Sequence, residues 1–470
     1  MLHKVTTERA EAYRLFHEGS IALARAEIAG IRADEDYFNK TIESQNQAII
    51  DCKLALAKTK LGSAWQKVYG NDVKYGSGDQ LRGILYQHLK LEPLNQTEKG
   101  VPAVDEPTLV QLKKKVPGIE ELLKLRKMEK ITGTYLKGFQ SEIVNGFIHP
   151  MFNLTTVRTY RSSSNKPNFQ NIPKRDKDLM RLIRSGLFAR KGHQLVEVDY
   201  SGLEVSIAAC YHQDPTMLTY LLKANTDMHG DVSQLCFFLT DYTKAKYGHV
   251  RNAIKNSFVF PQFYGDYYGN CAKGLCEWLE LPKGGRFDGK GWLMPNGTPI
   301  GTHLHNNGVT GFDKFLNHLQ KMEEDFWQVR FKVYAKWKEA HYASYLKNGY
   351  VDSFTGFRCW GPMSKNDAIN YPVQGAAFHC LLWAFVEIQK IAIAENWDSR
   401  LIGQIHDALI GDVNPQEINH VLRTINRVCT VELPKAWDWI CVPLKIEAEA
   451  TEVDGSWADI KHFDLGSILQ

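Results

Sequence analysis

The chain has 470 residues, and its 57 lysines and arginines exceed its 53 aspartates and glutamates by four, a formal net charge of +4. Hydrophobic residues make up 44% and charged residues 23%, which excludes a disordered or collagen-like protein and predicts about two to four globular units. No apolar run has the about 20 residues that span a bilayer, and the N-terminus lacks the apolar stretch of a secretory signal. Nine scattered cysteines do not resemble a disulfide framework. We therefore expect a cytoplasmic protein without a membrane partner.

The first 135 residues predict mostly helices, separated by turn-rich stretches. Two groups of basic residues, at 111–140 and 174–191, each carry a net charge of +5, which suits a groove that follows a nucleic-acid backbone. Either group alone is also explained as a solvated helix face, the commoner origin of such clusters. Apolar residues recur with helical spacing over residues 5–30, 34–60, 79–90 and 107–131.

Blocks of strands and helices follow in the rest of the chain. Residues 194–200, QLVEVDY, alternate apolar and polar side chains as a half-buried strand does. Residues 280–310 are rich in Gly, Pro and Asn and predict a long loop. Without a βαβ rhythm, the order of elements predicts an α+β fold. The other expected elements are helices over 203–265, 311–347 and 374–396, a hairpin over 400–413 and a strand over 441–453.

Two aspartates stand among apolar strand residues, where an unpaired acid costs free energy. Asp199 ends the strand at 194–200, and Asp407 lies at the tip of the 400–413 hairpin. If the two strands are neighbours, both carboxylates can hold two divalent cations that promote phosphoryl transfer. The alternative is that each is a turn aspartate without a further role, which the spacing alone favours.

A helix with cations followed by aromatic rings is predicted between residues 251 and 265. Arg251 and Lys255 are four positions apart and therefore share one helix face, where triphosphate oxygens can bridge them. The alternative is an amphipathic core helix whose basic residues extend to solvent. The aromatic residues that follow offer flat faces for base stacking, and they are Phe258, Phe260, Phe263 and Tyr264.

Together these segments resemble the polymerase core of the family A DNA polymerases. The resemblance spans nearly the whole chain, in the family's order. It implies a right-hand polymerase fold, with an antiparallel sheet in the palm and a helical thumb and fingers. The family's motifs A, B and C correspond to residues 198–204 (VDYSGLE), 251–265 and 405–407 (IHD), and further matches are 161–173 (RSSSNKPNFQNIP) and 370–377 (NYPVQGAA).

The resemblance also implies a division of the chain. Residues 1–190 would form the N-terminal helices, the thumb and the connection to the palm. Residues 191–240 and 366–470 would form the two parts of the palm, and residues 241–365 the fingers.

Roles of individual residues follow from the same resemblance. Asp199 and Asp407 would be the catalytic, metal-binding carboxylates, with the backbone carbonyl of Tyr200 as a further ligand for two Mg²⁺ ions, or for Mn²⁺ in their place. Glu204 would exclude a ribose because the 2′-hydroxyl has no room. Residues expected to bind the nucleotide are Arg251, Lys255, Phe260, Tyr264, Glu204 and His229, and those expected to contact primer–template DNA are Lys130, Arg161, Asn168, Gln170, Asn171, Asn370, Gln374 and His406. Singly, the amides and Arg161 are also explained as loop caps, and a lone histidine is usually structural.

Motif B departs from the family pattern in length. From Lys255 to Tyr264 there are nine positions where the family usually has eight, and Pro261 lies inside the helix, where it removes a hydrogen bond. We expect Phe260, four positions before Tyr264, to face the incoming base, with a helical bulge absorbing the extra residue. The other candidates for this position are Phe258 and Val259.

The resemblance implies a template-directed DNA polymerase that adds dNTPs to a primer 3′ end by two-metal phosphoryl transfer. We expect it to act as a monomer in phage DNA replication, in the host cytoplasm, without proofreading of its own. Its partners would be primer–template DNA and dNTPs, with a separate exonuclease or replisome protein as a further candidate.

Two other functions remain as alternatives. A single-subunit RNA polymerase has both aspartates and a non-acidic residue after the second one. This chain likewise has Ala408 after Asp407, where family A usually has a glutamate. Glu204 and the segments at 168–173 and 370–375 argue against it. A catalytically silent DNA-binding replication scaffold is disfavoured because both aspartates are retained.

Overall fold

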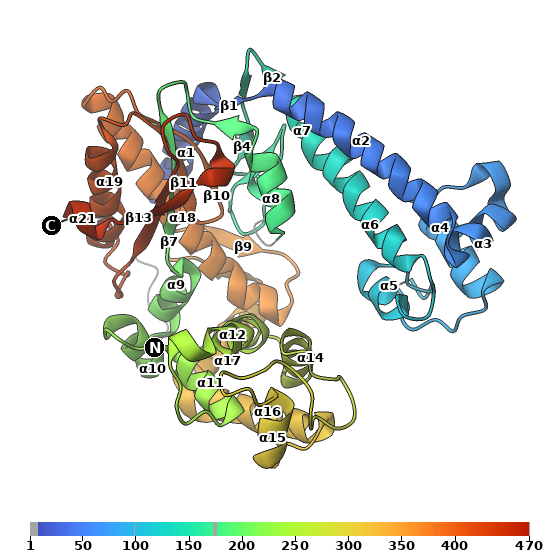
Figure 1. Cartoon of the computed structure of the whole chain (residues 1–470). Helices are drawn as coiled ribbons and strands as arrows, with labels where there is room; N and C mark the ends of the chain where they lie inside the picture. The colour runs from blue at the N-terminus through green and yellow to red at the C-terminus, as the bar shows by residue number, and fades with distance from the viewer. Residues whose placement is uncertain (1–7, 98, 173–175, 470) are drawn as a thin grey trace.

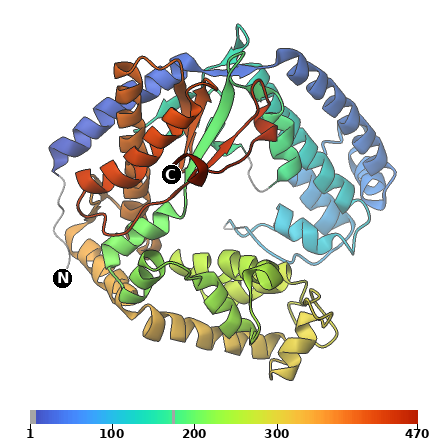
Figure 2. The same cartoon turned by 60° about the vertical axis from the view of Figure 1, so that its left-hand side comes forward.

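The computed structural model describes residues 8–97, 99–172 and 176–469. The fold has three parts, which we name the central part, the arm and the lobe (Figure 1). The central part holds the main β-sheet, the arm comprises residues 35–140, and the lobe comprises residues 228–348. Figure 2 shows the arm and the lobe projecting from the central part in different directions, which gives a hand-like outline. The expected α+β, right-hand fold is confirmed.

The main sheet has five antiparallel strands in the order β10-β11-β7-β12-β13. Val196 and Val198 of β7 are buried on one face of the sheet, so Asp199 lies on the opposite face. The register places Ala408 and Glu447 on the two strands beside Asp199. The strands are β7 (Gln194–Tyr200), with the bounds expected, β10 (Arg400–Ile405), β11 (Ala408–Val413), β12 (Ile446–Ala450) and β13 (Lys461–Phe463).

Helix α18 (Lys365–Ala394) packs on β10 and β11 and forms much of the core. Ser364 and Asp367 form a capping box at its start, and Pro372 lies in its interior. The helix therefore begins before the expected residue 374, since proline does not end it here. By length and composition α18 is apolar enough to cross a membrane, but 67% of its most apolar window is buried, as in a core helix.

The arm is a helical projection with its own apolar core, in which Trp65, Leu81 and Leu122 are fully buried. The helix expected over 107–131 is interrupted between Leu112 and Ile119, where Gly118 takes a φ of 110°, a backbone conformation that side chains rarely adopt. The helices are α2 (Glu35–Ala57), α3 (Lys60–Tyr69), α4 (Gly78–Arg82), α5 (Glu106–Leu112), α6 (Ile119–Lys130) and α7 (Lys137–Gln140), with a 3-10 turn η1 (Gly70–Asp72) and π turns η2 (Gly83–His88) and η3 (Ile131–Leu136).

The lobe is a bundle of short helices, of which α11 packs against α12 and α16. The segment 280–310, expected to be a long loop, contains helix α15 and buries Phe287, Met294 and Ile300, because its few apolar residues converge between glycine-rich turns. The helices are α11 (Met228–Phe237), α12 (Lys244–Ile254), α13 (Phe260–Phe263), α14 (Tyr268–Trp278), α15 (Ile300–Asn306), α16 (Phe312–Asp325) and α17 (Lys332–Asn348), with π turns η5 (Lys255–Val259) and η6 (Phe326–Arg330).

Shorter elements connect the three parts and complete the chain. The strand expected over 441–453 is confined to β12, since Pro443 precedes it and cannot donate to a strand ladder. The N-terminal connections are α1 (Arg9–Ala29), β1 (Ile31–Ala33), β2 (Ile143–Val144), β3 (Phe147–Ile148), β4 (Met151–Asn153), β5 (Ser163–Asn165), η4 (Phe169–Asn171), α8 (Lys177–Arg184) and β6 (Leu187–Phe188). The others are α9 (Leu203–His212), α10 (Pro215–Leu222), β8 (Tyr350–Asp352), β9 (Arg358–Trp360), α19 (Ile418–Arg427), η7 (Val428–Glu432), α20 (Leu433–Ala436), η8 (Trp457–Asp459) and α21 (Gly466–Leu469).

Candidate active site

The two aspartates meet at one end of the main sheet. Asp199 pairs in register with Ala408, the residue that follows Asp407, and the backbone N–H of Tyr200 donates to the carbonyl of Asp407 at 3.2 Å. His406 takes a φ of 54°, the left-handed value that lets a two-residue turn join β10 to β11. The hairpin therefore places Asp407 beside the end of β7, so the two strands are neighbours, as a site shared by both acids needs.

A chain of polar contacts links these acids to motif B. Arg161 donates from Nη1 to Glu204 Oε1 at 2.8 Å, and its Nη2 lies 3.8 Å from Asp407 Oδ1. The hydroxyl of Tyr264 donates to the other oxygen of Glu204. Burial, and then the Glu204 carboxylate, raise the pKa of Tyr264, so its hydroxyl stays protonated and can donate. Arg161 thus compensates part of the negative charge gathered at the end of the sheet.

The donor set of this centre fits a hard divalent cation. Asp199 and Asp407 offer carboxylate oxygens, and the Asp407 side chain is 24% exposed and so accessible to an ion. Across the described parts of the chain, no group of three or more His, Cys, Asp or Glu side chains converges on one point. Mg²⁺ suits such a pair, because it keeps several waters and is usually bound by one or two carboxylates together with substrate phosphates.

A π turn aligns the side chains of motif B. Residues four apart share a face of an α-helix, whereas residues five apart do so in a π turn, whose hydrogen bonds run from i to i+5. Arg251, Lys255, Phe260 and Tyr264 follow at steps of four, five and four, and η5 spans the five-residue step. The expected helical bulge is confirmed, and these four residues form what we name the motif B face.

The two phenylalanines of this segment differ in their surroundings. The Nζ of Lys255 lies 5.3 Å from the centroid of the Phe260 ring, and the His229 ring meets that ring edge-on at 5.7 Å. Phe258 is fully buried and packs edge-on against Phe326 in the lobe. Phe260, which is only partly buried, is therefore the ring that can face a base.

Arg251 is already held by a carboxylate that the sequence analysis did not single out. Its Nε donates to both oxygens of Asp227, at 3.0 and 2.8 Å. Although burial opposes it, the bond from Arg251 holds the pKa of Asp227 below its ordinary value. Burial, with Arg251 and Lys255, lowers the pKa of His229 to about 4, so this ring is neutral near pH 7. A triphosphate at Arg251 would have to compete with Asp227.

One pocket joins several of the expected nucleotide and DNA residues. Glu204 lines it from α9, Phe260 and Tyr264 line it from motif B, and Asn370 and Gln374 line it from α18. The pocket has apolar walls and a carboxylate held in place by two hydrogen bonds, which suits a sugar and base.

Other residues expected to contact DNA lie in the surrounding loops. The side-chain amide of Gln170 donates to the hydroxyl of Ser162 at 2.8 Å, and Asn168 Oδ1 accepts from the hydroxyl of Ser164 at 3.4 Å, so both side chains brace their own loop. Lys130 is exposed at the end of α6 in the arm. The side chain of Asn171 and all of Pro173 lie outside the described residues.

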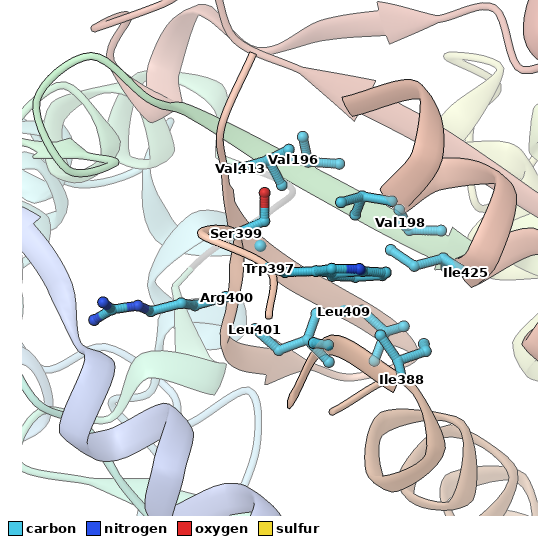
Figure 3. Close-up of a pocket in the computed structure, with 13 residues that line it drawn as sticks. Val196, Val198, Ile388, Trp397, Ser399, Arg400, Leu401, Leu409, Val413 and Ile425 are labelled. Carbon is cyan, nitrogen blue, oxygen red and sulfur yellow. The ribbon is translucent and has the colours of Figure 1, made fainter. Parts of the chain in front are cut away.

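Another pocket lies on the opposite face of the main sheet (Figure 3). Val196, Val198 and Leu409 line it, and the Trp397 indole lies across it while Arg400 points away. Its lining is almost wholly apolar and includes none of the expected site residues. The chemistry therefore belongs to the face that carries Asp199.

Comparison with known proteins identifies the family of the chain. The sequence model of DNA polymerase family A matches residues 47–284 and 320–459, most of the chain. The chain belongs to DNA polymerase family A. Residues 285–319, which include α15, lie in the lobe and outside the match.

Individual relatives agree with this family. The thermostable DNA polymerase I of Thermus aquaticus is 25% identical over 442 residues, which cover 91% of this chain and 46% of that protein. DNA polymerase I of Synechocystis sp. is 28% identical over 442 residues, covering 88% of this chain and 40% of that protein. The chain thus spans about half the length of the curated relatives it matches.

A solved structure supports the fold. The POL domain of Pol1 from M. smegmatis, in a complex with DNA primer-template and dNTP, superposes with a TM-score of 0.72 at 22% sequence identity. The match covers 94% of this chain and 70% of that chain.

Proposed function

We propose that this chain is a template-directed DNA polymerase that adds dNTPs to the 3′ end of a primer. The observation that carries the proposal is the contact chain from Asp407 through Arg161 and Glu204 to Tyr264, which joins the paired acids to the motif B face. Membership of family A and the relatives named DNA polymerase I support the same function.

The motif B face would hold the incoming nucleotide along its length. Arg251 and Lys255 would bind the triphosphate by charge-assisted hydrogen bonds, and Lys255 would stabilise charge on the departing pyrophosphate. Phe260 would stack on the base. The Glu204 carboxylate, fixed by Arg161 and Tyr264, would occupy the space that a ribose 2′-hydroxyl needs.

Asp199 and Asp407 would hold two Mg²⁺ ions, or Mn²⁺ in their place, together with the backbone carbonyl of Tyr200. When bound, such ions supply Lewis acidity that activates the primer 3′-hydroxyl and stabilises the leaving oxygen. The protein's own part is to hold both carboxylates at the end of the sheet, which the β7–β11 register does. Arg161 would contact the primer end from its place beside Asp407, while it holds Glu204.

Primer extension with purified protein tests this function. The wild type should extend a primed template with dNTPs and discriminate against rNTPs, while Asp407→Ala should bind the same DNA and extend nothing. Extension with rNTPs alone would favour the single-subunit RNA polymerase. If the wild type binds DNA but extends no primer over a range of Mg²⁺ and Mn²⁺ concentrations, the catalytically silent DNA-binding scaffold would be favoured.

A role in phage replication, in the host cytoplasm and without proofreading, stays a prediction. The purified chain is expected to leave a mismatched primer end untrimmed. Release of the mismatched nucleotide would contradict the absence of a 3′–5′ exonuclease activity in this chain.

A further inference from the structure

An exposed tryptophan stands on the hairpin that precedes α18. Trp360, the last residue of β9, is 71% exposed, whereas Trp278 on α14 is 39% exposed. Trp360 pairs in register with Tyr350 of β8, so both rings lie on the same face of the hairpin. A single exposed ring is common on protein surfaces, so what distinguishes Trp360 is its setting beside a second aromatic ring and a guanidinium on the same hairpin.

The same face of the hairpin carries a guanidinium. Arg358, two residues before Trp360, lies 3.5 Å from the centroid of the Tyr350 ring. Its Nε and Nη2 donate to the two oxygens of Asp352 at 2.7 and 2.8 Å, which fixes its orientation. We name Trp360, Tyr350 and Arg358 the hairpin platform. Aromatic rings beside a guanidinium form the kind of surface on which single-stranded nucleic acids stack.

The backbone beneath the platform is held at three carbonyls. The hydroxyl of Tyr160 donates to the carbonyl of Arg358 at 2.8 Å, and Arg158 donates to the carbonyl of Trp360 at 3.2 Å. The hydroxyl of Tyr345 donates to the next carbonyl, that of Gly361, at 2.9 Å. The opposite face of the hairpin is buried through Val351 and Cys359. The indole is thus presented on a rigid base, which lowers the entropic cost of binding.

Arg158 connects the platform to the polymerase site. Arg158, three residues before Arg161, lies 5.8 Å from the centroid of the Tyr371 ring on α18. The residue before Tyr371 is Asn370, which lines the pocket with Glu204. Figure 1 shows β9 at the centre of the molecule, between the main sheet and the lobe. The platform therefore borders the site at the start of α18.

We propose that Trp360 stacks on an unpaired base of the template strand. The inference rests on the proposed function, because a primer ends at the catalytic acids and beyond that point only the template is single-stranded. A base within the duplex is already stacked on both faces, whereas a template base past the primer end offers a free face. Arg158 donates to the backbone carbonyl of Trp360, and its cation suits the phosphate that adjoins the stacked base.

Binding measurements with DNA of different ends test the proposal without catalysis. Primer–template duplexes with 5′ template overhangs of increasing length, and a blunt duplex, are titrated with wild type, Trp360→Ala, Trp360→Phe and the control Trp278→Ala. Trp360→Ala should weaken binding of the overhang DNAs by about 5- to 150-fold, the range for losing one stacked base. It should leave the blunt duplex unaffected, and Trp360→Phe should lose less.

A second arm removes the base instead of the ring. With the wild type, an abasic site at the stacked overhang position should weaken binding as much as the Trp360→Ala substitution does. With Trp360→Ala, intact and abasic DNA should bind equally well, because the stacking contact is already lost. If Trp360→Ala does not fold, the same comparison is made with Trp360→Phe, which keeps a smaller ring and should show a smaller abasic effect than the wild type.

Two results would overturn the proposal. One is that Trp360→Ala weakens the binding of blunt and overhang DNA equally. The other is that neither Trp360→Ala nor the abasic site weakens binding at all. Primer extension by the wild type is measured in parallel. Extension without any effect at Trp360 refutes the stacking alone, whereas overhang-dependent binding without extension refutes the polymerase function alone.

Discussion

Phe258 and Phe260 are two residues apart, and their different burial predicts different consequences of truncation. Phe260→Ala removes a ring that borders the pocket lined by Glu204, next to Lys255 and His229, while the lobe core stays filled. Loss of base stacking is worth about 1–3 kcal/mol. The KM for dNTPs should therefore rise by about 5- to 150-fold, with little change in stability.

Phe258→Ala should show the reverse pattern. Its ring is 0% exposed and packs against Phe326, so truncation leaves a cavity in the lobe. Such a change costs about 3–5 kcal/mol of unfolding free energy. The KM for dNTPs should stay near the wild-type value at temperatures where the variant is folded.

Single-nucleotide insertion kinetics and urea unfolding separate the two effects. Both variants are measured with the same primed template and over the same urea range. A raised KM for Phe258→Ala with unchanged stability would show that the ring over the base was misassigned, and that the π turn does not set the register of motif B.

Three other changes test the remaining parts of the site. Deletion of Asn256 turns the five-residue π step from Lys255 to Phe260 into a four-residue α step, so both side chains stay on one helix face. Primer extension should survive this deletion but should be lost when an alanine is inserted at the same place. Glu204→Ala should raise the relative incorporation of rNTPs by about 100-fold, measured by competition on a primed template, and unchanged discrimination would remove Glu204 from the gate. Binding of a dNTP should raise the pKa of His229 from about 4 toward its ordinary 6.5, because the triphosphate offsets the nearby cations. NMR titration with and without the dNTP measures this pKa. An unchanged pKa would show that the nucleotide does not reach His229. Since the free protein's pKa lies below 6.5, the contribution of neutral His229 to stability is complete above pH 6.5 and is lost as the pH falls toward 4.

The sequence predicted those parts of the fold that a local pattern determines. The alternation in 194–200 gave the bounds of β7, and the apolar arms of 400–413 gave the β10–β11 hairpin. The spacing of motif B predicted a bulge, and the structure shows a π turn at Lys255–Val259. In each case the pattern of neighbouring side chains decides the conformation.

Features that depend on distant contacts escaped prediction. Asp227 binds Arg251 across 24 positions of sequence, and no local pattern distinguishes it from another helix-capping acid. Helix α15 lies in a glycine-rich segment, and its buried Ile300 and Leu304 become apparent only when the lobe is assembled. The exposure of Trp360 could not be read from its strand, because the same sequence suits a buried ring.

The central claim is that Asp199 and Asp407 act as one catalytic centre, and single-turnover incorporation by Asp199→Asn, Asp407→Asn and the double variant tests it most directly. If the two acids work as a unit, each single variant should lose nearly all activity and the double variant should lose little more. DNA affinity, measured in parallel, should stay near that of the wild type. Substantial activity in either single variant, or losses that multiply in the double variant, would contradict the shared centre.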